Sequence, residues 1–207
     1  MVESIIKVSS LSKKYDELAI LDDFSLEVKQ GEMVAILGES GCGKTTLLRI
    51  IAGFVKEDKG QVYLNGLLMN DKIAPNERNV AMVFQEPTLW NHMSVLKNIA
   101  YGMNTKDNEK IFSIMENLGI NGLEKRYPEE LSGGQAKRVA LARALASDKE
   151  ILFLDEPLSN IDSDTKEKIL RYIEKDFKGR KTILYVTHNR DEADFFGCRQ
   201  VKMGKRD

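Results

Sequence analysis

A glycine-rich stretch in the first quarter of the chain has the residue types that bind a phosphate chain. Residues 38–45 read Gly-Glu-Ser-Gly-Cys-Gly-Lys-Thr, which fits a glycine, four variable residues and then Gly-Lys-[Ser/Thr]. Glycines permit backbone conformations in which successive N–H groups face an anion near a helix N-terminus. Lys44 would add a positive charge, and Thr45 a hydroxyl ligand for a magnesium ion. The stretch predicts a nucleoside triphosphate site formed by Gly38, Glu39, Ser40, Gly41, Cys42, Gly43, Lys44, Thr45 and Thr46.

The segments on either side of this stretch fit the same chemistry. Residues 33–37 are uniformly apolar and predict a buried strand, and residues 45–52 predict a helix. A strand, a glycine loop and a helix in this order place the loop N–H groups at the positive end of the helix. The alternative, a glycine-rich turn with a chance lysine, does not require these flanking elements.

Two adjacent carboxylates follow a second apolar stretch. Residues 151–154 predict a buried strand of a parallel sheet, and Asp155 and Glu156 stand at its carboxyl end. Ligands of such sheets bind at that edge, where one carboxylate can hold Mg²⁺ and the other can take a proton from water. As an isolated pair, the two carboxylates could instead begin a helix.

Two more predicted strands end in polar residues. Residues 79–84 lead into Gln85, whose amide oxygen could reach a metal ion and an attacking water, and residues 182–186 lead through Thr187 to His188. A surface glutamine and a structural histidine are the ordinary interpretations of such residues. Their shared place at strand ends favours a functional role for both.

Three further features are open to two interpretations each. Tyr15 lies in a polar segment and could stack on an adenine ring or be a half-buried loop tyrosine. Residues 131–135, Leu-Ser-Gly-Gly-Gln, open an alanine-rich helix that runs to about residue 146, so they are a second potential phosphate site. Cys42 lies near a helix N-terminus, which favours reaction with thiol reagents, or it is only a small loop residue.

The remaining pattern predicts the elements that must position these residues. Strands are expected at residues 5–8, 24–28, 61–64 and 200–203, with turns at Asp22-Asp23, residues 29–32 and Asn65-Gly66. Helices are expected at residues 94–103 and 107–118, and a further one is capped by Asp162 or Ser163 and closed by Gly179. The predicted fold class is α/β: a mainly parallel sheet with an N-terminal antiparallel layer and an inserted helical part.

Composition narrows the function classes. The chain has 207 residues, 42% hydrophobic, and its 31 basic and 32 acidic side chains give a net charge of −1. No chain-wide basic field is available for nucleic acid, so a DNA or RNA partner is disfavoured. The two cysteines cannot form a disulfide framework, and no stretch is apolar and long enough for a predicted membrane span. These features predict a cytoplasmic protein.

Together the motifs resemble the ATP-binding cassette (ABC) ATPase family over residues 5–193. The most specific part is residues 131–135, which is similar to the family signature and is rarely found with such a loop elsewhere. The matching positions are the adenine-stacking aromatic at Tyr15, the Walker A motif at residues 38–45, the Q-loop glutamine at Gln85, the signature at Leu131, Ser132, Gly133, Gly134 and Gln135, the Walker B motif ending at Asp155, the general base at Glu156, the D-loop with Ser159 and Asp162, and the switch histidine at His188.

The resemblance implies a single ABC ATPase domain over residues 1–207. Its core, related to the RecA fold, would take in about residues 1–85 and 148–207, and its helical subdomain about residues 86–147. ATP and Mg²⁺ are the implied cofactors, with Thr45, Gln85 and Asp155 on the metal and with Lys44, Gln85, Glu156 and His188 as catalytic residues. The implied assembly is a head-to-tail dimer, of two copies or of paired subunits, in which the signature acts in trans on the partner's ATP.

Residues 87–96 are similar to the segment that faces the permease in bacterial nutrient importers of the family. The resemblance implies an integral membrane permease docking near residues 85–95, uptake of a solute, and a place on the inner face of the cell membrane. Trp90 has two interpretations, a docking residue or a core residue of the helical part. An exporter, a lipid-release ATPase or a cluster-assembly ATPase are the alternatives. Departures from the family pattern include Trp90, Asn91, Lys137, Asn160 and Asn189.

Overall fold

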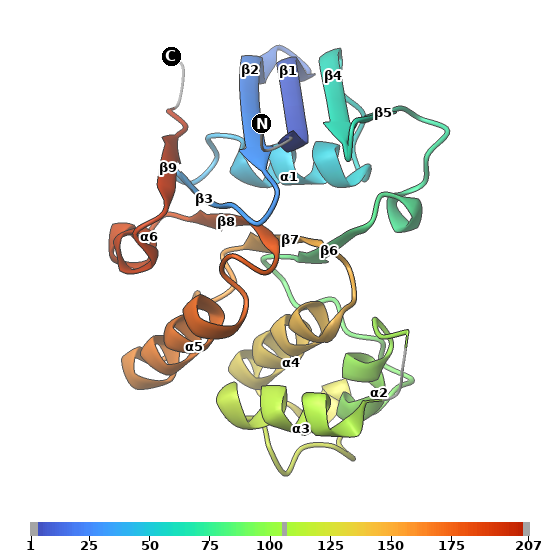
Figure 1. The fold of residues 1–207 in the computed structure, drawn as a ribbon, viewed down its shortest axis with the longest axis vertical. Coiled ribbons are helices and arrows are strands. Elements are labelled where there is room, and N and C mark those ends of the chain that lie inside the picture. Colours follow the sequence, from blue (N-terminus) through green and yellow to red (C-terminus); the bar gives the residue numbers. More distant parts are fainter. Residues whose placement is uncertain (1–3, 105–106, 205–207) are drawn as a thin grey trace.

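The computed structural model describes residues 4–104 and 107–204, and within them the chain forms two sheets and a set of helices (Figure 1). The larger sheet is parallel, with the strand order β6-β7-β8-β3-β9. Every residue of β3, β7 and β8 is buried, which suits a parallel sheet with both faces covered. The strands are β3 (Met33–Leu37), β6 (Val80–Val83), β7 (Ile151–Asp155), β8 (Thr182–Thr187) and β9 (Arg199–Lys202).

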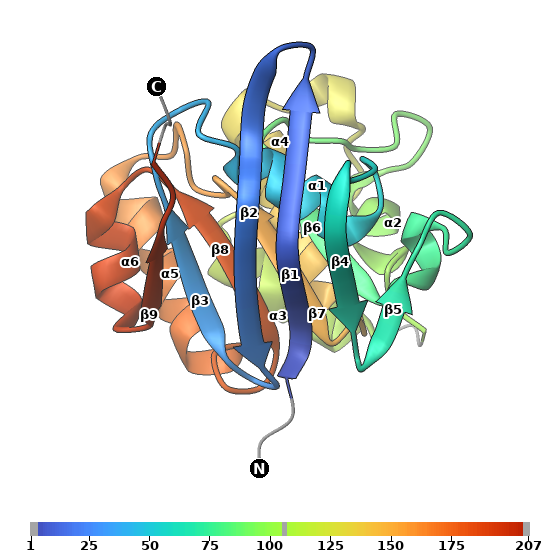
Figure 2. The same ribbon diagram turned by 90° about the horizontal axis from the view of Figure 1, so that it is seen from above.

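The smaller sheet is antiparallel and has the order β2-β1-β4-β5. Figure 2 looks onto this sheet, with the larger sheet behind it. Asn65 and Gly66 have φ angles of 50° and 73° and join β4 to β5, as their sequence predicts. The strands are β1 (Ser4–Tyr15), β2 (Leu18–Lys29), β4 (Lys59–Leu64) and β5 (Leu67–Met69), so β1 and β2 are longer than predicted and β5 was not expected.

The predicted turn at Asp22-Asp23 is wrong, because both residues lie inside β2. Leu11 pairs with Phe24 and Lys13 with Leu21, so two residues of β2 lie opposite one residue of β1. Asp23 has a φ of 51°, and its N–H donates to the Ser12 hydroxyl at 3.1 Å. A bulge of this kind accommodates a polar pair within a continuous strand.

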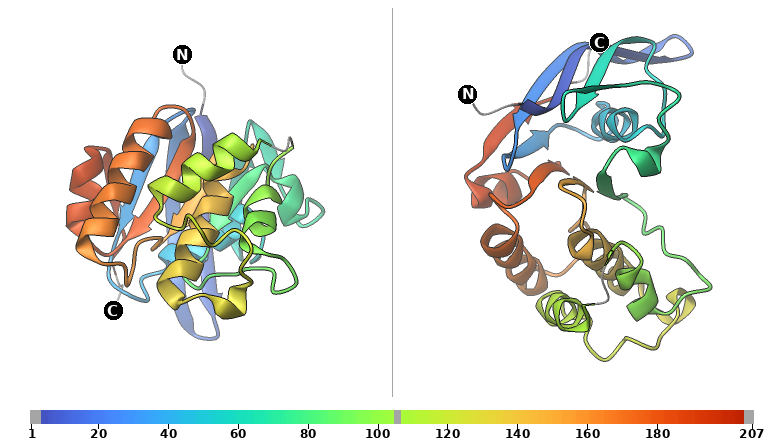
Figure 3. Two further views of the ribbon diagram at one scale, coloured as in Figure 1. Left: turned by 90° about the horizontal axis from the view of Figure 1, so that it is seen from below. Right: turned by 45° about the vertical axis from the view of Figure 1, so that its right-hand side comes forward.

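Helix α1 (Lys44–Ala52) lies between the two sheets (Figure 3, right). Its buried leucines and isoleucines belong to a cluster with apolar residues from both sheets. Examples are Ile6 of β1, Val62 of β4 and Phe153 of β7. The helix that follows the glycine-rich loop is therefore fixed on two sides.

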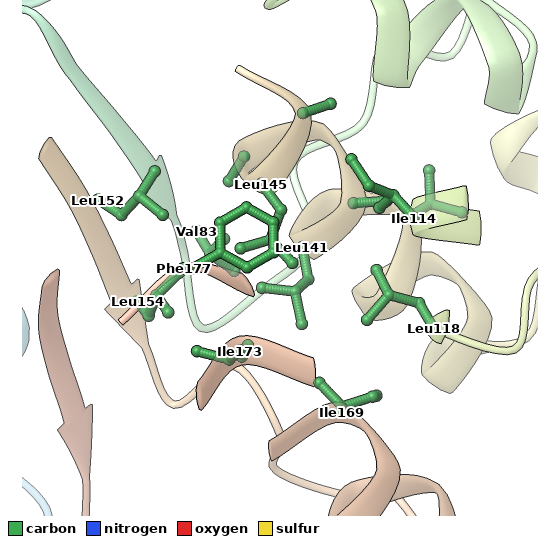
Figure 4. Packing of buried hydrophobic residues seen from close by; sticks show 14 of the residues in the cluster. Val83, Ile114, Leu118, Leu141, Leu145, Leu152, Leu154, Ile169, Ile173 and Phe177 are labelled. Carbon is green, nitrogen blue, oxygen red and sulfur yellow. The ribbon is translucent and has the colours of Figure 1, made fainter. Parts of the chain in front are cut away.

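A second apolar cluster covers the other face of the larger sheet (Figure 4). It joins strands, helix α4 (Gly133–Ala146) and helix α5 (Ser163–Asp176). The residues labelled in Figure 4 are Val83, Leu152 and Leu154 from the strands, Leu141 and Leu145 from α4, Ile169 and Ile173 from α5, Phe177 just after α5, Ile114 from helix α3 (Asn108–Asn117), and Leu118 just after α3.

Two helices continue this layer away from the sheet. They are α2 (Val95–Ala100) and α3 (Asn108–Asn117), each a little shorter than predicted, with Ser94 and Asp107 as their N-caps. Because α4 shares one apolar cluster with β6, β7 and α5, no gap in packing marks where a helical subdomain would end. The division at about residues 86–147 stays a prediction, and residues 1–3, 105–106 and 205–207 lie outside the described residues.

The end of the chain adds helix α6 (Arg190–Phe196), which the sequence did not predict, and β9. Strand β9 pairs in parallel with β3 at the edge of the larger sheet, close to the residues 200–203 predicted for it. Across residues 4–104 and 107–204, each helix is too short or too polar to cross a bilayer.

Candidate functional site

The glycine-rich loop connects β3 to α1, as predicted. Gly41 and Gly43 have φ angles of 83° and 99°, which non-glycine residues rarely adopt. A Cβ on Gly43 would lie 2.8 Å from the backbone oxygen of Ile20, so the loop also passes close to β2. Gly43 is the N-cap of α1 and offers no side-chain cap, so the first N–H groups of the helix remain available to an anion.

Lys44 spans this loop from the first position of the helix. Its side chain is buried at 5% exposure, and its ammonium group donates to the backbone oxygens of Gly38 at 2.7 Å and Glu39 at 2.9 Å. Because the lysine side chain is flexible, its ammonium group can exchange these carbonyl oxygens for phosphate oxygens with little change in the structure. The geometry supports the role predicted for Lys44.

Asp155 ends β7 and is almost inaccessible, at 1% exposure. Neither carboxylate oxygen has a hydrogen-bond partner in the described part of the chain. Burial raises the pKa of Asp155, and the nearby Thr45 hydroxyl opposes this shift without meeting hydrogen-bond geometry. Two unpartnered carboxylate oxygens beside a hydroxyl form a donor set that suits a hard cation such as Mg²⁺.

Glu156 follows in a strained backbone conformation with a φ of 46°. Its N–H donates to the backbone oxygen of Val186 at 2.9 Å, which fixes the residue against β8. The side chain is 12% exposed, and Oε1 lies 3.3 Å from Nδ1 of His188, whose side chain is 58% exposed. The strand ends thus bring the predicted base and the predicted switch histidine together.

A cavity of about 240 Å³ joins the glycine-rich loop to Gln85 and Glu156, while Asp155 and His188 do not line it. It lies over the glycine-rich loop and is open to an approaching ligand. Gln85, from the end of β6, and Glu156 face it together with the loop. Its lining residues are Ile20, Ser40, Gly41, Gly43, Lys44, Thr45, Thr46, Gln85 and Glu156.

Ile20 is the lining residue that sequence reasoning missed. It comes from β2, in the smaller sheet, and nothing in its local pattern distinguishes it from other apolar strand residues. The predicted contacts Gly38, Glu39 and Cys42 do not line this cavity. Tyr15 ends β1 at 47% exposure, with the Lys13 ammonium 5.5 Å from its ring centre, and does not line it either.

Cys42 is buried at 5% exposure. A Cβ on Gly38 would meet its sulfur at 2.5 Å and the Met203 carbonyl oxygen at 2.4 Å, so the loop is packed tightly here. The geometry favours the interpretation of Cys42 as a small loop residue over that of a reactive thiol.

The residues of the predicted signature form the start of α4 and do not line the cavity. The Ser132 hydroxyl accepts from the Gln135 N–H at 3.3 Å, and the Gln135 side chain accepts from the Ser132 N–H at 3.0 Å. Ser132 and Gly133 are exposed, and Leu131 packs partly against the larger cluster. This capping box presents an exposed helix N-terminus to another molecule.

The D-loop residues link the helix of the signature to Glu156. The Lys137 ammonium donates to the Ser159 hydroxyl at 2.5 Å, and that hydroxyl donates to the backbone oxygen of Glu156 at 2.9 Å. Asp162 caps α5 by accepting from the Thr165 N–H at 2.9 Å, and this hydrogen bond lowers the pKa of Asp162.

Trp90 lines a separate groove of about 490 Å³, bordered by the end of α1, by β6, by the residues just after α2 and by α4. Its ring lies 4.2 Å from the ring centre of Tyr101 and 4.2 Å from the Arg143 guanidinium. Burial lowers the pKa of Arg143, and its Nη1 has no hydrogen-bond partner in residues 4–104 and 107–204. Trp90 is therefore partly buried and also faces an apolar surface that a partner could cover.

A parallel sheet with a phosphate loop after β3 and carboxylates after β7 defines the class of P-loop nucleotide-binding domains. The family model described as ABC transporter matches residues 21–159, about two thirds of the chain. The chain belongs to the ABC transporter family, as its ATP-binding domain.

Relatives and solved structures agree with this assignment. The chain is 42% identical over 202 residues to the spermidine/putrescine import ATP-binding protein PotA of Clostridioides difficile (strain 630). The alignment covers 93% of this chain and 57% of PotA. It is 38% identical over 212 residues to the sulfate/thiosulfate import ATP-binding protein CysA 1 of Agrobacterium fabrum, covering 97% and 61%. The chain thus spans about three fifths of the length of these relatives.

The fold matches a dimeric post-hydrolysis state of the ATP-binding cassette MJ0796 bound to ADP and Pi, with a TM-score of 0.84 and 29% identity. That match covers 96% of this chain and 94% of the other. A bacterial Atm1-family ABC exporter with ATP bound is also similar, with a TM-score of 0.82, 25% identity and coverage of 93% and 36%.

Proposed function

We propose that the chain is the ATP-hydrolysing subunit of a transporter and that it powers solute uptake through a separate membrane permease. The observation that carries this proposal is the cavity that joins the phosphate loop to Gln85 and to Glu156, the residue that follows the buried Asp155. The import ATP-binding proteins among its relatives support uptake. An exporter or a cluster-assembly ATPase is the alternative.

Hydrolysis proceeds by in-line attack of water on the γ-phosphate of ATP. The water oxygen bonds to phosphorus, the bond to the β-phosphate oxygen breaks, and Glu156 accepts the water proton. Lys44 and the N–H groups at the start of α1 stabilise charge on the phosphoryl oxygens. His188, whose Nδ1 lies 3.3 Å from Oε1 of Glu156, is proposed to sense the γ-phosphate.

Thr45, Gln85 and Asp155 are the residues that would hold Mg²⁺. The unpartnered oxygens of Asp155 support this role. When bound, Mg²⁺ supplies charge neutralisation at the phosphates.

The active form is proposed to be a head-to-tail dimer with an identical or a paired subunit. In it, Ser132, Gly133 and Gly134 of one subunit contact the ATP held by the loop of the other. Two observations support the dimer: the signature residues do not line the cavity of their own chain, and Ser132 and Gly133 are exposed. The similar cassette in its dimeric state also supports it.

The groove beside Trp90 is the proposed docking surface for the permease, next to residues 85–95. Docking there would place the chain on the inner face of the cell membrane. Purification from solubilised membranes should recover a polytopic membrane protein with the parental chain, and Trp90→Ala should recover less of it. Recovery of soluble assembly proteins instead would favour the cluster-assembly alternative.

Replacement of Glu156 tests the proposed chemistry. Glu156→Gln should keep ATP binding and lower the rate of hydrolysis by about 100-fold or more, since an amide is a poor proton acceptor. The variant should also accumulate as an ATP-bound dimer on size exclusion. A variant that stays monomeric with ATP and hydrolyses it at the parental rate would exclude Glu156 as the base.

A further inference from the structure

Glu192 is a buried carboxylate behind the site. It lies on α6 at 4% exposure, and neither its position nor its surroundings follow from the sequence pattern. Oε2 accepts hydrogen bonds from the Tyr185 hydroxyl at 2.8 Å and the Thr187 hydroxyl at 2.9 Å, and Oε1 pairs with the Lys166 ammonium at 2.9 Å. A charge buried this deeply is tolerated only when it is paired and hydrogen-bonded, so the arrangement is fixed.

Thr187 connects this carboxylate to His188. Its hydroxyl donates to Glu192 and accepts from the Asn189 N–H at 3.0 Å. The backbone is therefore held on both sides of His188, whose own side chain is 58% exposed and has little packing to orient it. The Thr187 hydroxyl thus joins Glu192 to the backbone segment that carries His188.

Lys166 connects the same carboxylate to the D-loop. It lies one turn into α5, whose N-cap is Asp162, and its side chain is 24% exposed. A cavity of about 120 Å³ is lined by Lys166, Thr187 and Glu192. Glu156, Ser159 and His188 also line it. The segment before α5 is tied to Glu156 as well, through the Ser159 hydroxyl.

We infer that Thr187, Glu192 and Lys166 are positioning residues for hydrolysis, which hold His188 opposite Glu156 and tie it to the helix that follows the D-loop. None of the three touches the reacting atoms. A displacement of α5 when a partner subunit docks would reach His188 through Lys166 and Glu192. The inference rests on the proposed function, because it assigns these residues to the same reaction.

Replacement of Thr187 is the most direct test. Thr187→Val keeps the size of the side chain and removes the hydroxyl, so kcat for ATP should fall about 10-fold while KM changes less than about twofold. Thr187→Ser restores the hydroxyl and should restore kcat. Glu192→Gln provides a second variant that also loses the charge paired with Lys166, and it should lower kcat in the same way.

Lys178 offers a matched control. Its ammonium donates to the backbone oxygen of Phe196, so it also ties the end of α5 to α6 without contacting Glu192. Lys178→Met should leave kcat near the parental value. If it lowers kcat as much as Thr187→Val does, general docking of α6 explains the effect and the positioning role is wrong.

Histidine resonances separate this inference from the proposed function. The chain has two histidines, so a His92→Asn background leaves His188 as the source of the remaining imidazole signals. Thr187→Val should shift those signals in the nucleotide-free chain, and Thr187→Ser should return them. Unchanged signals and unchanged kcat in folded Thr187→Val would overturn the inference. If the parental chain does not hydrolyse ATP, or if Glu156→Gln does not slow the hydrolysis, the proposed function is wrong. The histidine resonances would still show whether Thr187 orients His188.

Discussion

Burial leaves both carboxylate oxygens of Asp155 without a hydrogen-bond partner among the described residues. An ionised carboxylate in such a place destabilises the folded chain, so the role proposed for Asp155 in holding Mg²⁺ lowers the stability of the nucleotide-free fold. Glu156, with its φ of 46°, stores strain at the next position. Such costs at two adjacent residues are typical of a site selected for ligand binding.

Asp155→Asn should therefore stabilise the nucleotide-free chain while abolishing hydrolysis. The free energy of unfolding at neutral pH should rise, because a neutral amide replaces a buried, ionised carboxylate. Because the pKa of Asp155 is raised in the folded chain, its destabilising effect is fully present above the folded pKa and is lost as the pH falls through that value toward the unfolded one. Denaturant unfolding of the parental chain and of Asp155→Asn should show that the difference between their free energies of unfolding becomes smaller as the pH falls. A difference that grows on acidification would contradict the account.

Cys42 is predicted to label slowly, since its side chain is buried against the loop. A thiol reagent should modify Cys198, which is half-buried, well before Cys42. Mass spectrometry of the peptides, with and without saturating ATP, measures both rates. Fast labelling of Cys42 that ATP prevents would restore the interpretation of a reactive thiol in the phosphate loop.

Helix α5 is held by its apolar face and begins directly after the D-loop. Ile173 has 0% exposure and lies in the cluster with Leu154 and Phe177 (Figure 4). Ile173→Ala should lower the free energy of unfolding by about 2–5 kcal/mol, because it removes buried carbon and leaves a cavity. Lys175→Ala, on the exposed face of the same helix, should change it by less than about 0.5 kcal/mol. Equal effects of the two substitutions in denaturant unfolding would show that α5 is not packed as described.

Elements with a uniform pattern could be predicted from the sequence, and irregular ones could not. The strands β3, β7 and β8 consist mainly of apolar residues, and β7 and β8 end in Asp155 and Thr187, so their buried place and their shared edge follow from the residues. The bulge at Asp22-Asp23 was missed because two adjacent aspartates ordinarily mark a turn. The seven residues of α6 are too few for a clear helical period.

In the site, too, some residues could be predicted from the sequence and others could not. The phosphate loop and Glu156 carry local signals in residue type and spacing, and Lys44, Gln85 and Glu156 do meet in one cavity. Ile20 reaches that cavity from the other sheet, and Lys166 of α5 reaches Glu192 of α6. Contacts of this kind depend on tertiary packing, which no local pattern records.

At the scale of the whole molecule, the smaller sheet and the larger sheet enclose α1, and the helices α2–α5 lie beyond the larger sheet (Figures 1 and 3). This arrangement separates the phosphate loop, at the start of α1, from the exposed start of α4. The cavity over the loop includes no residue of the signature. In the proposed dimer, each chain would contribute two half-sites, and a second chain would complete each of them.

A mixing experiment with two inactive variants tests this composite site most directly. Lys44→Ala removes the positive charge that would contact the phosphates of ATP. Ser132→Arg places a bulky cation where the partner's γ-phosphate should dock. Each variant alone should hydrolyse no ATP, although Ser132→Arg should still bind it. Asp107→Arg, which replaces the N-cap of α3, controls for the loss of a helix cap, worth about 1 kcal/mol. In a mixture of the two variants, some dimers pair an intact loop with an intact signature, and partial hydrolysis should return. Hydrolysis at the parental rate by Ser132→Arg alone would contradict the account.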